Sequence, residues 1–466
     1  MKNNRAYSLD AFRGYAIITM ILSGAIASGV LPAWMYHAQV GPRSGGAFDP
    51  SFYGITWVDL VFPFFLFAMG ASFPFSIGSK LAKGVGKLRL AGDAILRGIR
   101  LTFFAIFIQH MYPWSQAAPQ DAASWGIAIA AFFLMFPMFT RINRPLPAWM
   151  KVGIELGAYA VGIVLLLTVP YANDRTFSLA YSNIIILVLA NMAIFGSLIY
   201  LFTAHNKCAR IGVLPFVMAV FLGSTTEGSW VADVMKFTPL PWMYNFFYLK
   251  YLFIVIPGSI AGEYLRDWLK QRTNADERPD KRTPWILLLS VLLIVWNLYG
   301  LYTRQLVLNF WGTTAMLIGL YCLLRGEGTN HTYWRRLFVA GAYLLMLGLF
   351  FEAYQGGIRK DDSTYSYYFV TSGLAFIALI VFPILCDLYR VKWLVRPLEM
   401  AGQNPMIAYV APNLLIMPIL SLVGLDTYLN MLNHGAWTGF LRGVIVTALA
   451  VAIAMVCTKK RWFWRT

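Results

Sequence analysis

His37 and Asp59 are the side chains whose types and positions best suit proton transfer or nucleophilic chemistry. His37 lies in the loop 31–56 after the first apolar run, and Asp59 opens the next run with eleven uncharged residues behind it. A carboxylate at the mouth of such a helix can hold one imidazole nitrogen and leave the other free as a base or nucleophile. The alternative is structural, with Asp59 placed favourably at a helix N-terminus and His37 merely solvated.

Asp10 and Arg13 form a second pair of charges, within Ser8–Gly14 at the start of the first apolar run. A charge at that depth is costly unless it is paired or faces a polar cavity, so the pair predicts a functional site. The alternative is a capped helix entry, with Ser8 as the N-cap and Arg13 extending toward the lipid headgroups. The chemistry of these residues leaves both interpretations open.

The elements that position these residues are expected to be membrane-spanning helices. The chain has 466 residues, of which 59% are hydrophobic and 13% charged. A span needs about 20 mostly apolar residues, and about fourteen such runs recur along the chain. They lie near 10–30, 57–79, 98–114, 123–141, 150–170, 183–203, 212–228, 247–265, 285–302, 306–325, 336–354, 367–389, 404–424 and 438–458. We therefore predict an all-α polytopic membrane protein, a bundle of about 12–14 transmembrane helices.

The distribution of charge excludes a nucleic-acid-binding class, although the net charge is +17. Lys and Arg gather in alternate loops, such as 80–100 and 266–282, and are sparse in the others. This positive-inside pattern predicts an even number of spans, both termini in the cytoplasm, and a plasma (bacterial inner) membrane location. The basic face would meet anionic lipid and an anionic cytosolic cofactor. No metal-ligand spacing is present.

We expect one integral-membrane domain with three notable parts. These are a signature-bearing core with its outer loop, a cytoplasmic linker and a C-terminal span pair, at 1–115, 266–284 and 392–466. Proline and glycine interrupt several runs, which suggests a polar cavity among the helices because broken backbone is tolerated where it lines one. Glu227 and Lys250 lie near outer ends of runs, and Lys250 needs a partner if it does not extend to the interface.

Three segments resemble a known family. Ser8–Gly14, S-L-D-x-F-R-G, resembles the opening signature of a broad group of transmembrane acyltransferases. Gly54–Gly70, G-x-T-x-x-D-L-V-F-P-F-F-L-F-x-M-G, is similar to the heparan-α-glucosaminide N-acetyltransferase family and its bacterial relatives. Gly402–Tyr409 resembles the G-x-N-s-i-x-x-Y of that family, and Thr225–Gly228 echoes its D-P-E-G.

The resemblance implies a multi-span enzyme that takes acetyl-CoA on the cytoplasmic side and passes the acetyl group to an amino sugar on the other side. It implies that the histidine of an H-A dipeptide, here His37, carries the acetyl group or acts as the base. It further implies that Asp59 lines the site, with Asn404 as a third member. One departure is that the loop after His37 is longer than in the family, so that Asp49 falls in register when counted back from Gly54.

Such a transfer needs cations for the phosphates of CoA and polar groups for the acceptor. We expect Arg13 with Asp10, and Arg97 and Arg100 of the basic loop, to bind the CoA. The substrate-facing residues are expected to be Asp49, Glu227 and Lys250. The acceptor, the acyl chain, N- or O-acylation, an acyl-histidine or a direct transfer, and a homodimer stay open. The alternative functions are a transporter or flippase for a glycan or lipid-linked sugar, and an inactive relative retained as a scaffold.

Overall fold

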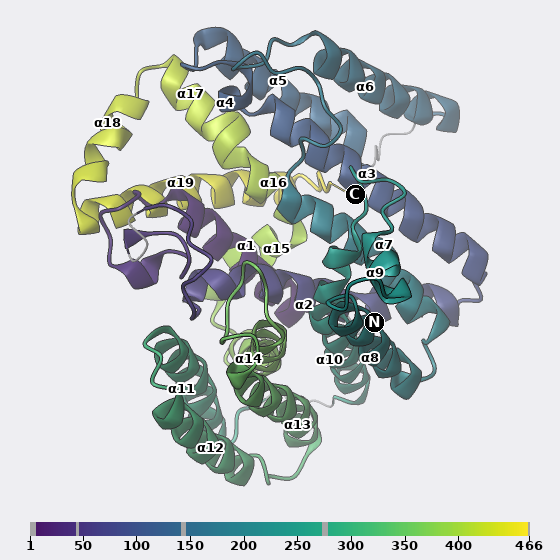
Figure 1. Cartoon of the computed structure of the whole chain (residues 1–466), viewed down its shortest axis with the longest axis vertical. Helices are drawn as coiled ribbons and strands as arrows, with labels where there is room; N and C mark the ends of the chain where they lie inside the picture. The colour runs from purple at the N-terminus through teal and green to yellow at the C-terminus, as the bar shows by residue number, and fades with distance from the viewer. Residues whose placement is uncertain (1–5, 43–45, 141–145, 273–277, 465–466) are drawn as a thin grey trace.

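The structure is a computed structural model that describes residues 6–42, 46–140, 146–272 and 278–464. Over these ranges it is built of helices and contains no β-sheet (Figure 1). The long helices are α1 (Tyr7–Ala25), α2 (Trp57–Ala82), α3 (Lys87–Met111), α5 (Ala122–Phe139), α6 (Ala148–Thr168), α7 (Ile184–Phe202), α8 (Lys207–Gly223), α10 (Leu252–Gln271), α11 (Thr283–Tyr302), α12 (Leu306–Leu323), α13 (Thr329–Phe350), α14 (Tyr365–Pro383), α15 (Lys392–Gln403) and α19 (Ala436–Lys459).

Shorter helices complete the chain. They are α4 (Pro113–Gln116), α9 (Trp230–Lys236), α16 (Pro405–Ala411), α17 (Met417–Leu422) and α18 (Asp426–Met431), with 3-10 turns η1 (Ala33–Met35), η3 (Phe246–Tyr251), η5 (Phe351–Ala353) and η8 (Leu432–His434), and π-helical segments η6 (Ile384–Leu388) and η7 (Pro412–Ile416).

The described residues contain 11 helices that are long and apolar enough to cross a membrane. This confirms the expected all-α polytopic class. Each of the apolar runs predicted from the sequence falls at least partly on a helix, and α1, α3 and α8 are the three outside this set of 11. The exact number of spans and the side of the termini stay predictions. We call the end of the bundle that carries Tyr7 the inner end and the end that carries His37 the outer end.

Three local expectations are corrected by the helix bounds. Ser8 is not an N-cap, because it lies inside α1 with its side chain fully buried, and Ala6 precedes the helix. The basic segment 80–100 is mostly helical, since α2 continues to Ala82 and α3 begins at Lys87. The expected linker 266–284 begins within α10 and ends within α11, and its residues 273–277 lie outside the described ranges.

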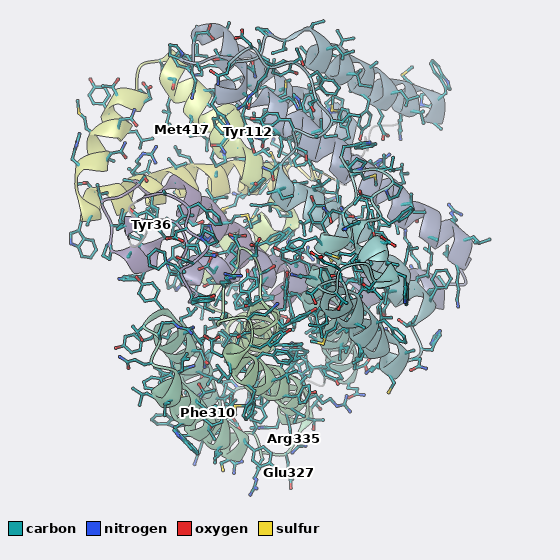
Figure 2. All side chains as sticks on the ribbon, viewed as in Figure 1. Tyr36, Tyr112, Phe310, Glu327, Arg335 and Met417 are labelled. Atoms are coloured by element: carbon teal, nitrogen blue, oxygen red, sulfur yellow. The ribbon has the colours of Figure 1, made fainter. Side chains whose placement is uncertain are left out.

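The centre of the molecule is formed by α1, α2, α10 and α14 (Figure 1). The span that includes α14, Tyr365–Leu388, is 94% buried over its most apolar window, which explains why it is hydrophobic on every side. The α11–α12 hairpin lies at one edge of the molecule and α5 and α6 lie at the opposite edge. Figure 2 labels Phe310 and Glu327 at the α11–α12 edge, and Tyr36 of the outer loop lies well away from them. The peripheral helices expose most of their apolar faces, as expected next to lipid.

Gly14 and Gly402 explain how two of the family-like segments meet. A Cβ on Gly14 would lie 1.8 Å from the carbonyl oxygen of Leu398, and a Cβ on Gly402 would lie 1.9 Å from the carbonyl oxygen of Asp10. The backbones of α1 and α15 therefore touch directly, a contact that only small residues allow. The last residue of the S-L-D-x-F-R-G segment is thus needed for packing, whatever the chemistry of its neighbours.

Candidate active site

Asp59 organises the outer end of α2. The backbone N–H of Thr56 donates to its Oδ2 at 2.9 Å, and Thr56 caps the same helix, so the two form a capping box. The backbone N–H of Ala38 donates to the same oxygen at 3.1 Å, and the Tyr367 hydroxyl donates to the Asp59 carbonyl at 2.9 Å. The side chain is only 2% exposed. Asp59 therefore stabilises the N-terminus of α2, as the structural alternative expected, and this role occupies only one of its two carboxylate oxygens, Oδ2.

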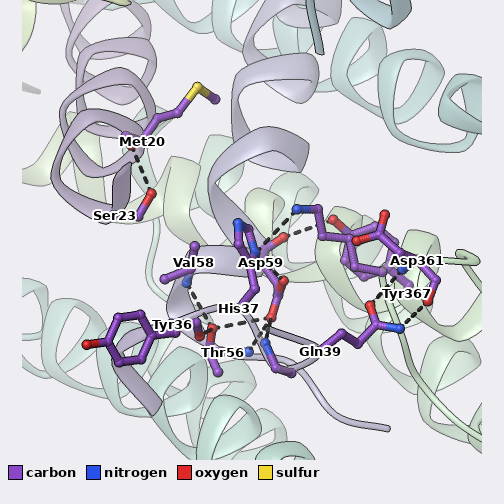
Figure 3. Close-up of polar contacts among 12 residues, drawn as sticks. Met20, Ser23, Tyr36, His37, Gln39, Thr56, Val58, Asp59, Asp361 and Tyr367 are labelled. Carbon is purple, nitrogen blue, oxygen red and sulfur yellow. Dashed lines mark hydrogen bonds and ion pairs between the residues drawn. The ribbon is translucent and has the colours of Figure 1, made fainter. Parts of the chain in front are cut away.

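The other oxygen of Asp59 faces His37. Its Oδ1 lies 2.8 Å from Nδ1 of His37 (Figure 3). Because a carboxylate only accepts hydrogen bonds, this contact places the proton on Nδ1 and leaves Nε2 with its lone pair. The His37 side chain is 39% exposed, so Nε2 can be reached. The two residues chosen from the sequence as the most reactive are thus brought into direct contact.

A third charged residue joins this pair from a distant part of the chain. Nζ of Lys360 lies 3.3 Å from Nδ1 of His37, and Lys360 also interacts electrostatically with Asp59. Because Nδ1 already donates to Asp59, the ammonium acts mainly as a charge that balances the buried carboxylate. Its loop, 354–364, is fastened to the outer loop: Gln39 accepts a hydrogen bond from the Asp361 N–H at 2.9 Å, and the Gly54 N–H donates to the Ile358 carbonyl at 2.7 Å.

His37 lies on the wall of two cavities. One, of about 310 Å³, lies between α1, α16, η7 and α19 and is lined by Met20, Ile21, Ser23, Gly24, Ala25, His37, Ile185, Tyr409, Pro412, Asn413, Met417, Arg442 and Val446. The other, of about 360 Å³, lies under the outer loop and is lined by Ser23, Ser28, Gly29, Tyr36, His37, Val40, Gly41, Pro42, Gly46 and Val58. Ser23, on α1 in Figure 3, is common to both. Two separate molecules can therefore approach the same imidazole.

The first cavity is lined by a helix interrupted at Pro412, as expected from the prolines in the apolar runs. Pro412 begins the π-helical segment η7, between α16 and α17, and lines the first cavity together with Asn413. π-helical turns occur frequently at functional sites because they redirect side chains. Phe12, about two turns before Met20 on α1, packs against Phe64 and Phe67 of α2 and does not line this cavity.

Asp49 does not take the place of His37. Its Oδ1 accepts the Ser51 N–H at 2.8 Å on the exposed part of the outer loop. The hydrogen bonds from the Ser51 side chain and backbone lower the pKa of Asp49 below its ordinary value, so this carboxylate is a poor base. Both ends of this longer segment are fastened to the loop 354–364, through Gln39 to Asp361 and through Gly54 to Ile358.

Asn404 lies at the inner end, at the junction of α15 and α16. Its Nδ2 donates to the Thr458 hydroxyl at 3.0 Å and to the Trp462 carbonyl at 2.9 Å, and its Oδ1 accepts the Trp464 N–H at 3.3 Å. These contacts tie the family-like Gly402–Tyr409 segment to the end of α19. The structure thus gives Asn404 a structural role and does not bring it to His37; the catalytic role implied by the resemblance stays a prediction.

The expected substrate residues Glu227 and Lys250 have different surroundings. Glu227 is exposed in the turn between α8 and α9. Lys250 is 9% exposed, with Nζ 3.4 Å from the Ser363 carbonyl and above the rings of Phe221 and Phe247. Lys250 thus supports the loop 354–364 that carries Lys360 and does not line either cavity of His37.

The residues expected to bind CoA lie at the inner end. Asp10 and Arg13 form an ion pair at 3.7 Å, and an Arg13 Nη donates to the Gly402 carbonyl at 3.4 Å. Arg13 is also close enough to Arg97 for the two positive charges to repel. The Nε of Arg97 is buried and has no hydrogen-bond partner in the described part of the chain. The structure therefore brings Arg13 and Arg97 together, about 10 Å along α1 from Met20, the first α1 residue that lines the His37 cavity, and about 17 Å from Gly24.

A third cavity, of about 290 Å³, opens beside Arg97. Lys80, Asp93, Arg97 and Arg100 are among its lining residues. Lys80 is paired with Asp93 at 2.8 Å and Arg100 with Glu155, so two of the three cations are already neutralised. This leaves Arg97 as the cation best placed to receive an added anion. Arg100, expected as an equal partner, has an internal carboxylate instead.

Lys360 and Gln39 are the site residues that the sequence analysis missed. Lys360 contacts His37, and Gln39 contacts Asp361. Each contact joins segments more than 300 residues apart, so neither local spacing nor the apolar pattern indicates it. One signal was present: Arg359–Asp362 is a dense run of charge in a loop predicted to be outer, where cations are sparse.

The sequence profile of a family described as a domain of unknown function, DUF5009, matches residues 5–265, which is more than half of the chain. The chain belongs to this family. The matched part of this DUF5009 protein contains His37, Asp59, Arg13 and Arg97, whereas Lys360 and Arg442 lie beyond it.

Two acetyltransferases are similar to a shorter part of this DUF5009 protein. Heparan-alpha-glucosaminide N-acetyltransferase from Mus musculus is 32% identical over 105 residues, and the Homo sapiens protein of the same name is 36% identical over 105 residues. Each match covers 22% of this chain and 14% of the relative. The resemblance predicted from the motifs is confirmed: the DUF5009 protein is a distant relative of these membrane N-acetyltransferases, which supports an acyltransferase-like function.

Proposed function

We propose that this protein transfers an acetyl group from acetyl-CoA to an amino sugar or another saccharide, with His37 as the reacting side chain. The observation that carries the proposal is the contact between Nδ1 of His37 and the buried Asp59, which leaves the lone pair on Nε2 of a residue that lines two cavities. The distant relationship to N-acetyltransferases supplies the reaction class. A second observation supports a nucleotide donor: Arg97 has an unpartnered buried Nε, among the described residues, beside Arg13.

Two reaction sequences fit an imidazole with a free Nε2. In a direct transfer, Nε2 removes a proton from the acceptor amine or hydroxyl as that atom attacks the thioester carbonyl. The tetrahedral intermediate then expels the CoA thiolate, which takes the proton back from Nε2. In a covalent route, Nε2 itself attacks the thioester and expels the CoA thiolate, which leaves an acyl-imidazolium. The acceptor then attacks the acyl carbon, the bond to Nε2 breaks, and the freed Nε2 takes the acceptor's proton. In both routes Asp59 stabilises the positive charge that develops on His37.

The proposed sidedness assigns one substrate to each end of the bundle. The donor enters from the inner end, where Arg13 and Arg97 would hold its phosphates, and the acceptor enters from the outer end through the cavities of His37. The proposal requires that the thioester reach from Arg13 and Arg97 to Nε2 through the interior of the bundle, where water is excluded.

The proposal is tested with purified protein in lipid nanodiscs and radiolabelled acetyl-CoA. We expect the wild-type protein to bind acetyl-CoA and to transfer its label to glucosamine, and the variant His37→Ala to retain binding but lose transfer at least 1,000-fold, roughly the effect of removing such a residue. His434→Ala is the matched control, because His434 is an exposed outer histidine. Failure of the wild-type protein to bind acetyl-CoA would overturn the proposal and favour the transporter or flippase interpretation. Equal transfer by His37→Ala would remove His37 from the mechanism.

A further inference from the structure

Arg442 is a cation in the His37 cavity that the proposed reaction does not use. It lies near the outer end of α19, which passes beside α1 (Figure 1). One Nη donates to the carbonyl of Ala25, the last residue of α1. Its Nε is buried and has no hydrogen-bond partner in the described ranges, and no described carboxylate lies within ion-pair distance. A guanidinium group has five donors, so most of its capacity is unaccounted for.

A structural role explains only part of this arrangement. A cation at the C-terminal end of a helix is favourable, and the contact with Ala25 closes the end of α1 in this way. A partly buried charge with a dry, unpaired Nε is nevertheless costly, and membrane proteins pair such groups or place them where they meet a ligand. The side chain of Arg442 lines the same cavity of about 310 Å³ as His37, Ser23 and Asn413. The unused donors therefore belong to a space large enough for a small polar molecule.

We propose that this cavity selects an acceptor that carries an oxyanion, a carboxylate or a phosphate, and that Arg442 binds this group while His37 faces the reacting amine or hydroxyl. The inference rests on the proposed acyl transfer. A guanidinium pairs with carboxylate or phosphate through two parallel hydrogen bonds, which fixes the orientation of the molecule as well as its affinity. An anionic acceptor would then be held with its reactive atom toward Nε2.

The position of Arg442 favours the acceptor over the donor as the source of the oxyanion. Arg442 and His37 both lie at the outer end, whereas Arg13 and Arg97, the candidates for the CoA phosphates, lie at the inner end. The separation is about 17 Å from Arg13 to Gly24 along α1 alone. A lipid phosphate is the competing source, since Arg442 is only half-buried and close to the expected interface.

Equilibrium binding in nanodiscs, without any acyl donor, tests the inference. The probes are glucosamine 6-phosphate and glucosamine, which differ only in the phosphate. We expect wild-type protein to bind the phosphate form more tightly, and Arg442→Gln to weaken that binding about 10- to 100-fold, as for loss of a charge-assisted pair, while binding of glucosamine changes less than about twofold. Arg442→Lys should recover part of the loss. Arg175→Gln, an exposed outer arginine, is the matched control.

Three outcomes overturn the inference: no preference for the phosphate form, an equal loss for both sugars in Arg442→Gln, or loss of the preference when phosphatidylglycerol replaces phosphatidylcholine in the nanodisc. The last result would assign Arg442 to lipid. An Arg442-dependent preference without any acetyl transfer would instead keep the anion site and reject the proposed function. The two failures are therefore distinguishable.

Discussion

The most informative perturbation is Asp59→Asn, because the structure dictates how the new amide must turn. The N–H groups of Ala38 and Thr56 both donate to one carboxylate oxygen, so they require an acceptor at that position. An asparagine satisfies them only with its Oδ1, which forces its NH₂ group toward Nδ1 of His37. Nδ1 then has to accept, and the imidazole carries its proton on Nε2 instead.

The size of the effect follows from this change of tautomer. With the proton on Nε2, His37 has no lone pair to offer to the acceptor or to the thioester. An Asp→Asn change with this consequence in a serine protease lowers kcat by about 10⁴, and we expect a loss of about 10³- to 10⁴-fold here. That corresponds to about 4–5.5 kcal/mol of transition-state stabilisation. The fold should survive, since asparagine keeps the hydrogen bonds from the Thr56 N–H at the α2 N-terminus and from the Ala38 N–H of the outer loop.

The assay is transfer of radiolabel from acetyl-CoA to glucosamine by Asp59→Asn, His37→Ala and the double variant. Residues that act as one unit are strongly non-additive. The double variant should therefore be no slower than His37→Ala, with melting temperatures of all three close to wild type. Activity of Asp59→Asn within tenfold of wild type would refute the tautomer argument. A further large loss on adding His37→Ala to Asp59→Asn would refute it as well.

Four other changes test separate parts of the structure. Lys360→Met should lower kcat/KM about tenfold by leaving the buried Asp59 charge unbalanced, and an unchanged rate would remove Lys360 from the site. Arg97→Gln should raise the KM for acetyl-CoA about tenfold or more with little change in kcat, and an equal effect of the exposed control Arg89→Gln would contradict a phosphate site. Gly14→Ala should lower the free energy of unfolding by about 1–3 kcal/mol, measured as a lower melting temperature. Gly157→Ala, with open space around it, should leave the melting temperature unchanged. Asp280→Asn should lower the free energy of unfolding at pH 7 by less than about 1 kcal/mol, seen as a slightly lower melting temperature, because Asp280 is half exposed. Burial raises the pKa of Asp280, but the hydrogen bonds from Thr283 and His331 outweigh it and lower the pKa overall. The difference from wild type should therefore fade as the pH falls through that lowered pKa, and its persistence at low pH would contradict the assignment.

Much of the architecture could be predicted because lipid imposes a simple rule on sequence. A backbone in hydrocarbon must satisfy its own hydrogen bonds, so long apolar runs become helices. The pairing of His37 with Asp59 could also be anticipated, since a histidine in the outer loop and an acid at the next helix entry are brought together by chain connectivity. The sequence left the choice between His37 and Asp49 open, and it stays a prediction; the structure adds that Asp49 accepts a hydrogen bond from Ser51 within its own loop.

Other features depend on contacts that no local pattern records. Lys360 reaches the site only because the loop before α14 is fastened to Gln39 and Gly54. Asn404 was expected at the site because it lies in the family-like segment Gly402–Tyr409. Its hydrogen bonds with the backbone of Trp462 and Trp464 could not be foreseen from spacing. Arg442 looked like one of several sparse outer cations until α19 placed it beside the end of α1.

The direct backbone contacts at Gly14 and Gly402 restrict how this protein can change shape. The same kind of contact recurs between α2 and α10, where a Cβ on Gly70 would lie 2.1 Å from the Val255 carbonyl oxygen and one on Gly258 would lie 2.3 Å from that of Phe67. Sliding at these positions would drive one backbone into another, so each of these helix pairs resists it. α1 therefore moves with α15, and α2 moves with α10. Any opening between the two ends of the bundle must come from motion of one pair against the other or from helices outside both pairs.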